Sequence, residues 1–70
     1  MVTNERLIAE YTIDSKYIAL SRRHWDNGRV DYIVCADGYY AGFEDLNRAC
    51  FDFGAEIAGI VETAVKAGRL

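Results

Sequence analysis

The chain has 70 residues, which is enough for one domain and too few for two. Hydrophobic residues make up 51% of it and aromatic residues 13%, a composition that excludes intrinsic disorder. A formal net charge of −3 argues against a protein that coats nucleic acid by charge alone. No apolar run is long enough to span a membrane, and the first six residues lack the layout of a signal peptide, so we expect a cytoplasmic protein.

The two cysteines agree with a reducing compartment. Cys35 and Cys50 each lie in an apolar stretch, so we expect two small buried side chains, with a disulfide between them as the alternative. Together with His24 they are too few ligands for a metal site within one chain. We therefore expect no metal and no cofactor.

Residues 6–13 alternate apolar and polar side chains with period two, which predicts a strand. One face of this strand would carry Leu7, Ala9, Tyr11 and Ile13. A helix over residues 4–10 is the alternative, because Glu, Arg, Leu and Ala favour helix. A second extended segment is expected over residues 16–25.

The helical alternative would give the element order α-β-β-β-α, which resembles a double-stranded-RNA-binding domain in topology only. Such domains carry a basic stretch at the start of the last helix. Residues 44–48 of this chain read Glu-Asp-Leu-Asn-Arg instead, so the resemblance does not imply RNA binding.

Three turn signals divide the first 43 residues into an antiparallel meander. Asp-Ser at residues 14–15 ends the first strand. Asp-Asn-Gly at residues 26–28 predicts a three-residue hairpin loop with Gly28 in the left-handed region. Asp-Gly at residues 37–38 predicts a two-residue type I′ turn between the strands 30–35 and 39–43.

From residue 44 onward the apolar spacing becomes three and four, which predicts one long helix. Its apolar stripe comprises Leu46, Cys50, Phe53, Ile57, Ile60 and Ala64. Gly68 is the expected C-cap. The expected ion pairs on its polar side are Glu44–Arg48, Arg48–Asp52 and Glu62–Lys66.

These elements predict an α+β fold. A three- to four-stranded antiparallel β-meander is followed by one long C-terminal α-helix packed on the sheet, and residues 1–70 form a single domain.

A second apolar row runs along the same helix. It comprises Phe51, Gly54, Ala58, Val61 and Val65. A glycine inside a helix costs about 1 kcal/mol relative to alanine, so Gly54 and Gly59 indicate close approach of another backbone. Either this wide face beds into a curved sheet, or it contacts a second copy. We favour a homodimer, because the core of so short a chain is marginal.

No set of residues has the spacing of a catalytic site. His24 is the one histidine, and a pair with Cys35 would lack a third group to orient it. The aspartates at the turns are explained by turn chemistry, and the glycines are too scattered for a phosphate-binding loop. We expect no catalytic residues and therefore no enzyme.

An arginine-rich hairpin tip is the compositional anomaly of the sheet. Arginines there would suit phosphate, and Trp25 would suit stacking on a base. Trp and Arg are also enriched where proteins bind proteins. The third interpretation is a solvated tip whose arginines pair with Asp26 and Asp31. The candidate partner-binding residues are Arg22, Arg23, Trp25, Arg29 and Tyr40.

Tyr40 is included because adjacent residues of a strand face opposite ways. Either Tyr39 or Tyr40 therefore belongs to the core, and the other lies on the outer face of the sheet. With Tyr17 or Tyr32, the outer one would form an exposed aromatic strip.

The leading hypothesis is a small acidic non-enzymatic binding protein that occupies a surface of a larger protein or ribonucleoprotein complex. In size and charge only, it is similar to phage or mobile-element inhibitors of host machinery such as anti-CRISPR proteins. The alternative is a dimeric nucleic-acid-binding or transcription-regulating module that uses the Arg22–Arg29 hairpin. A structural or accessory subunit is the third hypothesis.

Overall fold

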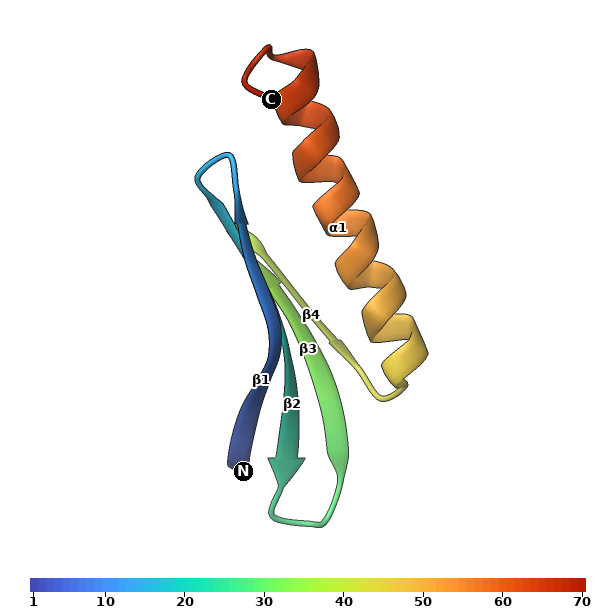
Figure 1. Cartoon of the computed structure of the whole chain (residues 1–70). Coiled ribbons are helices and arrows are strands. Elements are labelled where there is room, and N and C mark those ends of the chain that lie inside the picture. The colour runs from blue at the N-terminus through green and yellow to red at the C-terminus, as the bar shows by residue number, and fades with distance from the viewer.

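The computed structural model describes residues 1–70 as a four-stranded antiparallel sheet followed by one helix (Figure 1). The elements are β1 (Val2–Ile13), β2 (Lys16–Trp25), β3 (Val30–Ala36), β4 (Tyr39–Phe43) and α1 (Leu46–Lys66). The strands are adjacent in chain order, and α1 packs on the sheet, so the expected α+β fold is confirmed. Residues 4–10 are strand, so the helical alternative and its topological resemblance do not apply.

The three hairpin turns differ in backbone conformation. Asp14 and Ser15 both have positive φ (52° and 63°), the combination that a type I′ turn requires. Gly28 has a φ of 84°, as predicted for the second turn. In the third turn only Gly38 has positive φ (75°), so the two-residue hairpin is confirmed but the predicted type I′ turn is wrong. Its first central residue, Asp37, stays outside the left-handed region.

Both ends of α1 are capped by local chemistry. The side chain of Asp45 accepts a hydrogen bond from the backbone N–H two residues later (3.2 Å), which satisfies one free donor of the first turn. At the other end, the backbone N–H groups of Gly68 and Arg69 donate to the carbonyls of Val65 (3.0 Å) and Ala64 (2.9 Å). This is the Schellman pattern, which requires a residue with positive φ just after the helix, and Gly68 provides it with a φ of 75°. Gly68 therefore ends the helix as predicted, but it follows the C-cap residue, which is Ala67.

The hydrophobic core lies between α1 and one face of the sheet. Its buried residues are Ile18, Leu20, Val34, Ala49 and Phe53. The predicted stripe of α1 is confirmed from Phe53 to Ala64, but at its start Cys50 is exposed and Ala49 is buried instead. Ala49 and Cys50 are adjacent on the helix, and the sheet passes on the side of Ala49. Burial of Cys50 was therefore a wrong prediction, whereas Cys35 is half-buried, and both thiols are free.

A bulge in β1 moves Leu7 to the face of the sheet opposite α1. Leu7 pairs with Ser21 and Ala9 pairs with Leu20, so Ile8 is an extra residue between two paired positions. Ala9 packs against the core, whereas Leu7 does not. The predicted common face for the apolar residues of β1 is therefore wrong at Leu7, because an alternation rule does not anticipate an inserted residue.

Contacts with the sheet replace two of the ion pairs expected along α1. The carboxylate of Glu44 accepts a hydrogen bond from Arg29 Nη2 at 2.6 Å, and both oxygens of Asp52 lie 3.0 Å from the hydroxyl of Tyr39. The hydrogen bond to Asp52 favours the protonated phenol and so raises the pKa of Tyr39. Arg48 is left with no carboxylate partner, and both pairs predicted for it are wrong.

Two isoleucines provide a matched test of this core. Ile18→Ala is expected to lower the free energy of unfolding by about 3 kcal/mol, because Ile18 is fully buried under α1. Ile8→Ala removes the same atoms from a side chain that is 47% exposed, and should cost less than about 1 kcal/mol. Urea unfolding followed by Trp25 fluorescence measures both. Equal losses would contradict the assigned core.

Candidate functional site

The face of the sheet opposite α1 is covered by no other element (Figure 1), and we term it the open face. A hollow of about 350 Å³ lies on it. The hollow draws on all four strands, and its lining residues are Glu5, Leu7, Tyr17, Ala19, Ser21, Ile33, Cys35 and Tyr40. Strand pairing brings these residues together, because Leu7 lies opposite Ser21 and Cys35 lies opposite Tyr40.

The floor of the hollow is buried although no helix covers it. Ala19, Ser21 and Ile33 are between 4% and 8% exposed. Longer side chains around the floor form walls beside these residues, and the walls remain exposed. The exposed walls are Leu7, Tyr17 and Tyr40. The open face is thus an ordered apolar floor with accessible walls.

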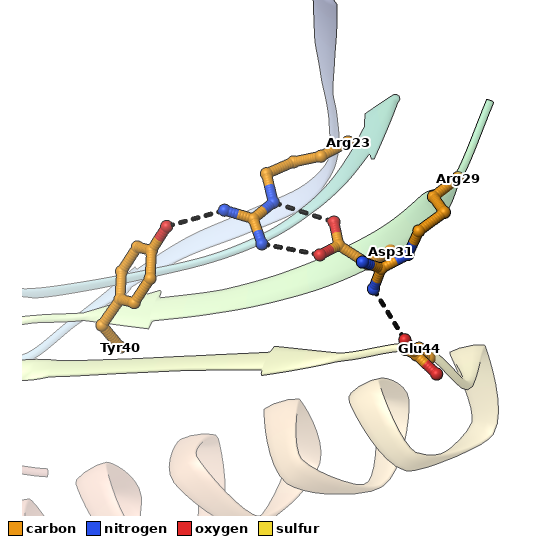
Figure 2. Close-up of polar contacts among 5 residues, drawn as sticks. All are labelled: Arg23, Arg29, Asp31, Tyr40 and Glu44. Atoms are coloured by element: carbon orange, nitrogen blue, oxygen red, sulfur yellow. Dashed lines mark hydrogen bonds and ion pairs between the residues drawn. The ribbon is translucent and has the colours of Figure 1, made fainter. Parts of the chain in front are cut away.

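Hydrogen bonds fix the two tyrosine walls. The hydroxyl of Tyr17 donates to Glu10 Oε2 at 2.6 Å, and this bond raises the pKa of Tyr17 because it favours the protonated phenol. The hydroxyl of Tyr40 accepts from Arg23 Nη1 at 3.0 Å (Figure 2). Rings that are already held lose less freedom when a partner binds. Of the two alternatives for the exposed aromatic strip, Tyr17 lies on the open face with Tyr40, whereas Tyr32 packs against the core.

A buried ion pair adjoins the hollow on the same face. Arg23 Nε lies 2.9 Å from Asp31 Oδ1 and Arg23 Nη2 lies 2.8 Å from Oδ2, a bidentate arrangement (Figure 2). Asp31 is 7% exposed. The Arg23 guanidinium also lies 5.1 Å from the centre of the Trp25 ring, within reach of a cation–π interaction. Arg23 therefore links Asp31, Trp25 and Tyr40 into one network.

This network shifts the pKa values of both charged partners. The two hydrogen bonds from Arg23 lower the pKa of Asp31 more than burial raises it, and the same contact raises the pKa of Arg23. The indole N–H of Trp25 contributes to lowering the pKa of Asp31, although Nε1 is buried with no hydrogen bond inside ordinary distance and angle limits. Water still reaches part of the pair, since the Arg23 side chain is 14% exposed and that of Asp31 is 10% exposed.

The structure divides the predicted partner-binding residues between three places. Arg23, Trp25 and Tyr40 lie on the open face. Arg22 points to the other face, because adjacent residues of a strand alternate. Arg29 reaches across to Glu44 before α1 (Figure 2). The arginines therefore do not form one cationic tip, and the predicted pairing of Asp31 with an arginine is confirmed.

Sequence reasoning missed most of the hollow. Alternation predicts Leu7 on the opposite face, and the predicted site residues include neither Ser21 nor Ile33. The signal that could have found Ser21 is the alternation of β2 itself, which places Tyr17, Ser21 and Arg23 on one side. The partners from β1 and β3 depend on strand register, which the bulge shifts.

The arrangement suits recognition by shape and apolar contact. Cys35 pairs with Ala19, which is five residues from His24 along β2, so His24 and Cys35 lie on opposite faces of the sheet. The Cys–His pair considered from the sequence therefore does not form.

The predicted dimer-interface row lies on the outer side of α1. Phe51, Gly54, Ala58, Val61 and Val65 are all exposed. Phe51 is 81% exposed and Val65 is 53% exposed. The alternative in which this row beds into a curved sheet is therefore wrong, because α1 turns its other side to the sheet.

Comparison with known proteins gives no relative: no family model matches the chain, and no curated protein or solved structure is significantly similar to it. The structure has no helix with the length and hydropathy needed to cross a membrane.

Asp31→Asn tests the ion pair and its pH dependence. At pH 7 it is expected to cost about 2 kcal/mol, because Arg23 loses its carboxylate; partial exposure keeps this below the loss for a deeply buried pair. Since the folded pKa of Asp31 is lowered, its stabilisation is complete above the unfolded value of about 3.9 and is lost as the pH falls through the folded pKa.

Urea unfolding from neutral to strongly acid pH is the measurement. The wild type should lose stability in the acid range more steeply than Asp31→Asn. Asp37→Asn, in an exposed turn, is the control and should follow the wild type. Parallel curves for wild type and Asp31→Asn would show that the pair contributes no pH-dependent stability.

Proposed function

We propose that this protein is a small non-enzymatic binding module that acts by occupying a surface of a larger protein or ribonucleoprotein complex, and that its open face makes the contact. The observation that supports this proposal is an ordered apolar hollow, walled by exposed side chains, that the fold leaves uncovered. Tyr, Trp and Arg are the residue types enriched where proteins bind tightly. Here Tyr40, Trp25 and Arg23 form one network beside the hollow.

The chemistry of the rim indicates the kind of partner. Glu5 lines the hollow and Glu10 holds its Tyr17 wall, whereas the charge of Arg23 is already balanced by Asp31. The uncompensated charge at this rim is thus negative. A volume of about 350 Å³ is near the lower end of the range for ligand pockets. A protein segment with a large apolar side chain next to Lys or Arg fits both features.

The nucleic-acid alternative has weaker support. Two of the three hairpin arginines are paired with carboxylates, Arg23 with Asp31 at 2.8 Å and Arg29 with Glu44 at 2.6 Å. Phosphate would have to displace those carboxylates, and the net charge of −3 opposes its approach.

The main proposal has a more specific form, in which this protein is a cytoplasmic inhibitor from a phage or mobile element and its partner is host machinery. Size and net charge are what support that form.

Adjacent residues of β1 provide a matched test of the open face. Leu7 is 48% exposed and Ile8 is 47% exposed, but only Leu7 lines the hollow. The wild type, Leu7→Glu and Ile8→Glu would each be purified by an affinity tag from lysate of the native host, with and without nuclease treatment. A protein that co-purifies with the wild type and Ile8→Glu should be lost from Leu7→Glu.

Tyr40→Ala should weaken the same interaction by at least about tenfold, since it removes a wall of the hollow. A partner retained equally by Leu7→Glu and Ile8→Glu would contradict the open face as the binding surface. Recovery of nuclease-sensitive nucleic acid without any protein would instead favour the arginine hairpin.

A further inference from the structure

We propose that a second copy of this chain docks on the outer side of α1. The two helices are antiparallel, with Gly54 of one copy opposite Ala58 of the other. This contact is independent of the open face, which lies on the opposite side of the sheet.

The outer side of α1 carries a long uncharged strip. Phe51, Gly54, Ala58, Val61 and Val65 recur at spacings of three and four, so they share one side of the helix over about 21 Å. The charged residues of α1 all lie off this strip. An exposed strip of this kind is typical of a surface that packs against another helix.

Packing within a single copy explains neither helical glycine, and Gly54 is the one that lies on the strip. A Cβ built on it would meet no atom within 4 Å, so the glycine is not required by packing inside the chain. Its φ is not in the left-handed region that favours glycine. A helix-interior glycine is nevertheless unfavourable relative to alanine. Close approach of a second helix at Gly54 accounts for it, because small residues at a crossing point let two backbones come together.

The single copy also exposes more surface than its mass predicts. Its accessible area is 4752 Å², whereas a folded monomer of 7.9 kDa is expected to expose about 4,400 Å². Its radius of gyration is 13.5 Å, against about 11 Å for a compact domain of this length. Covering the outer side of α1 in a dimer reduces this excess.

One candidate charge pair supports this register and direction. Arg48 has no carboxylate partner in the single copy. Glu62 is exposed, and its Oε1 lies 2.7 Å from Lys66 Nζ, which is the ion pair predicted from the sequence. In an antiparallel pair with Gly54 opposite Ala58, Phe51 faces Val61. The same register brings Arg48 of one copy beside Glu62 of the other. Because the dimer has two-fold symmetry, this ion pair occurs twice, once at each end of the contact.

The two helical glycines give a matched test on the full chain. Gly59, like Gly54, has open space around a built Cβ, but it lies on the other side of the helix from the strip. Leucine at either position is a better helix former, so neither substitution threatens folding. A helix pair buries less than a standard interface, so we expect a dimer with a micromolar dissociation constant.

Sedimentation equilibrium over a range of concentrations is the measurement. Gly54→Leu should raise the dissociation constant at least about 30-fold, because it blocks the crossing point, whereas Gly59→Leu should change it by less than about threefold. A wild type that stays monomeric at its highest soluble concentration overturns the proposal. So does a dimer on which the two leucine substitutions have equal effects.

A charge exchange tests the register separately. Arg48→Glu and Glu62→Arg should each weaken the dimer, because each places like charges together, and the double variant should restore it. A double variant no stronger than the weaker single variant overturns the antiparallel register. Far-UV circular dichroism on all three confirms that the helix is intact.

Discussion

One helix has to cover a four-stranded sheet, and this constraint decides which surfaces of the protein are left for partners. Four strands span about 14 Å between their outer axes and have two faces, whereas a helix with its side chains is about 10 Å wide. α1 packs on β2, β3 and β4 and on one face only. As a result only 10 of 70 residues are buried, and large apolar side chains remain exposed on both sides of the molecule.

The uncovered face keeps its order by means other than a second layer. Arg23 and Asp31 form a bidentate ion pair beside the hollow, and Arg23 extends to the hydroxyl of Tyr40 and the ring of Trp25. Tyr17 is held separately by Glu10. These contacts hold the walls of the hollow in place while leaving the hollow accessible. A surface that is both ordered and uncovered meets the requirement for binding with little loss of conformational freedom.

Features set by neighbours in the sequence could be predicted well. The turn at Gly28 and the C-terminal motif at Gly68 follow from the freedom of glycine to adopt positive φ, and the length of α1 follows from its apolar spacing. Alternation over residues 6–13 predicts a strand, whereas the propensity of residues 4–10 favours a helix, and β1 confirms the strand.

Features set by pairing between strands could not be predicted in the same way. The bulge at Ile8 places Leu7 on the open face, so the hollow includes residues of all four strands. An alternation rule does not predict this, because it does not allow for an inserted residue. The carboxylates expected for Arg48 bind Arg29 and Tyr39, because tertiary partners compete with neighbours one helical turn away. Exposure of the second row on α1 likewise depends on which side of the helix meets the sheet, which spacing alone leaves open.

The proposed arrangement has two parts: the open face is bare, and a second copy covers the outer side of α1. Methyl NMR with a soluble paramagnetic agent tests both parts at once, because relaxation by the agent reports exposure. Leu7 and Val65 are 48% and 53% exposed in a single copy, whereas Ile18 is fully buried. At high protein concentration we expect strong relaxation for Leu7, none for Ile18, and protection of Val65. Protection of Leu7 as complete as that of Ile18, or equal relaxation of Val65 and Leu7 at every concentration, would overturn this arrangement.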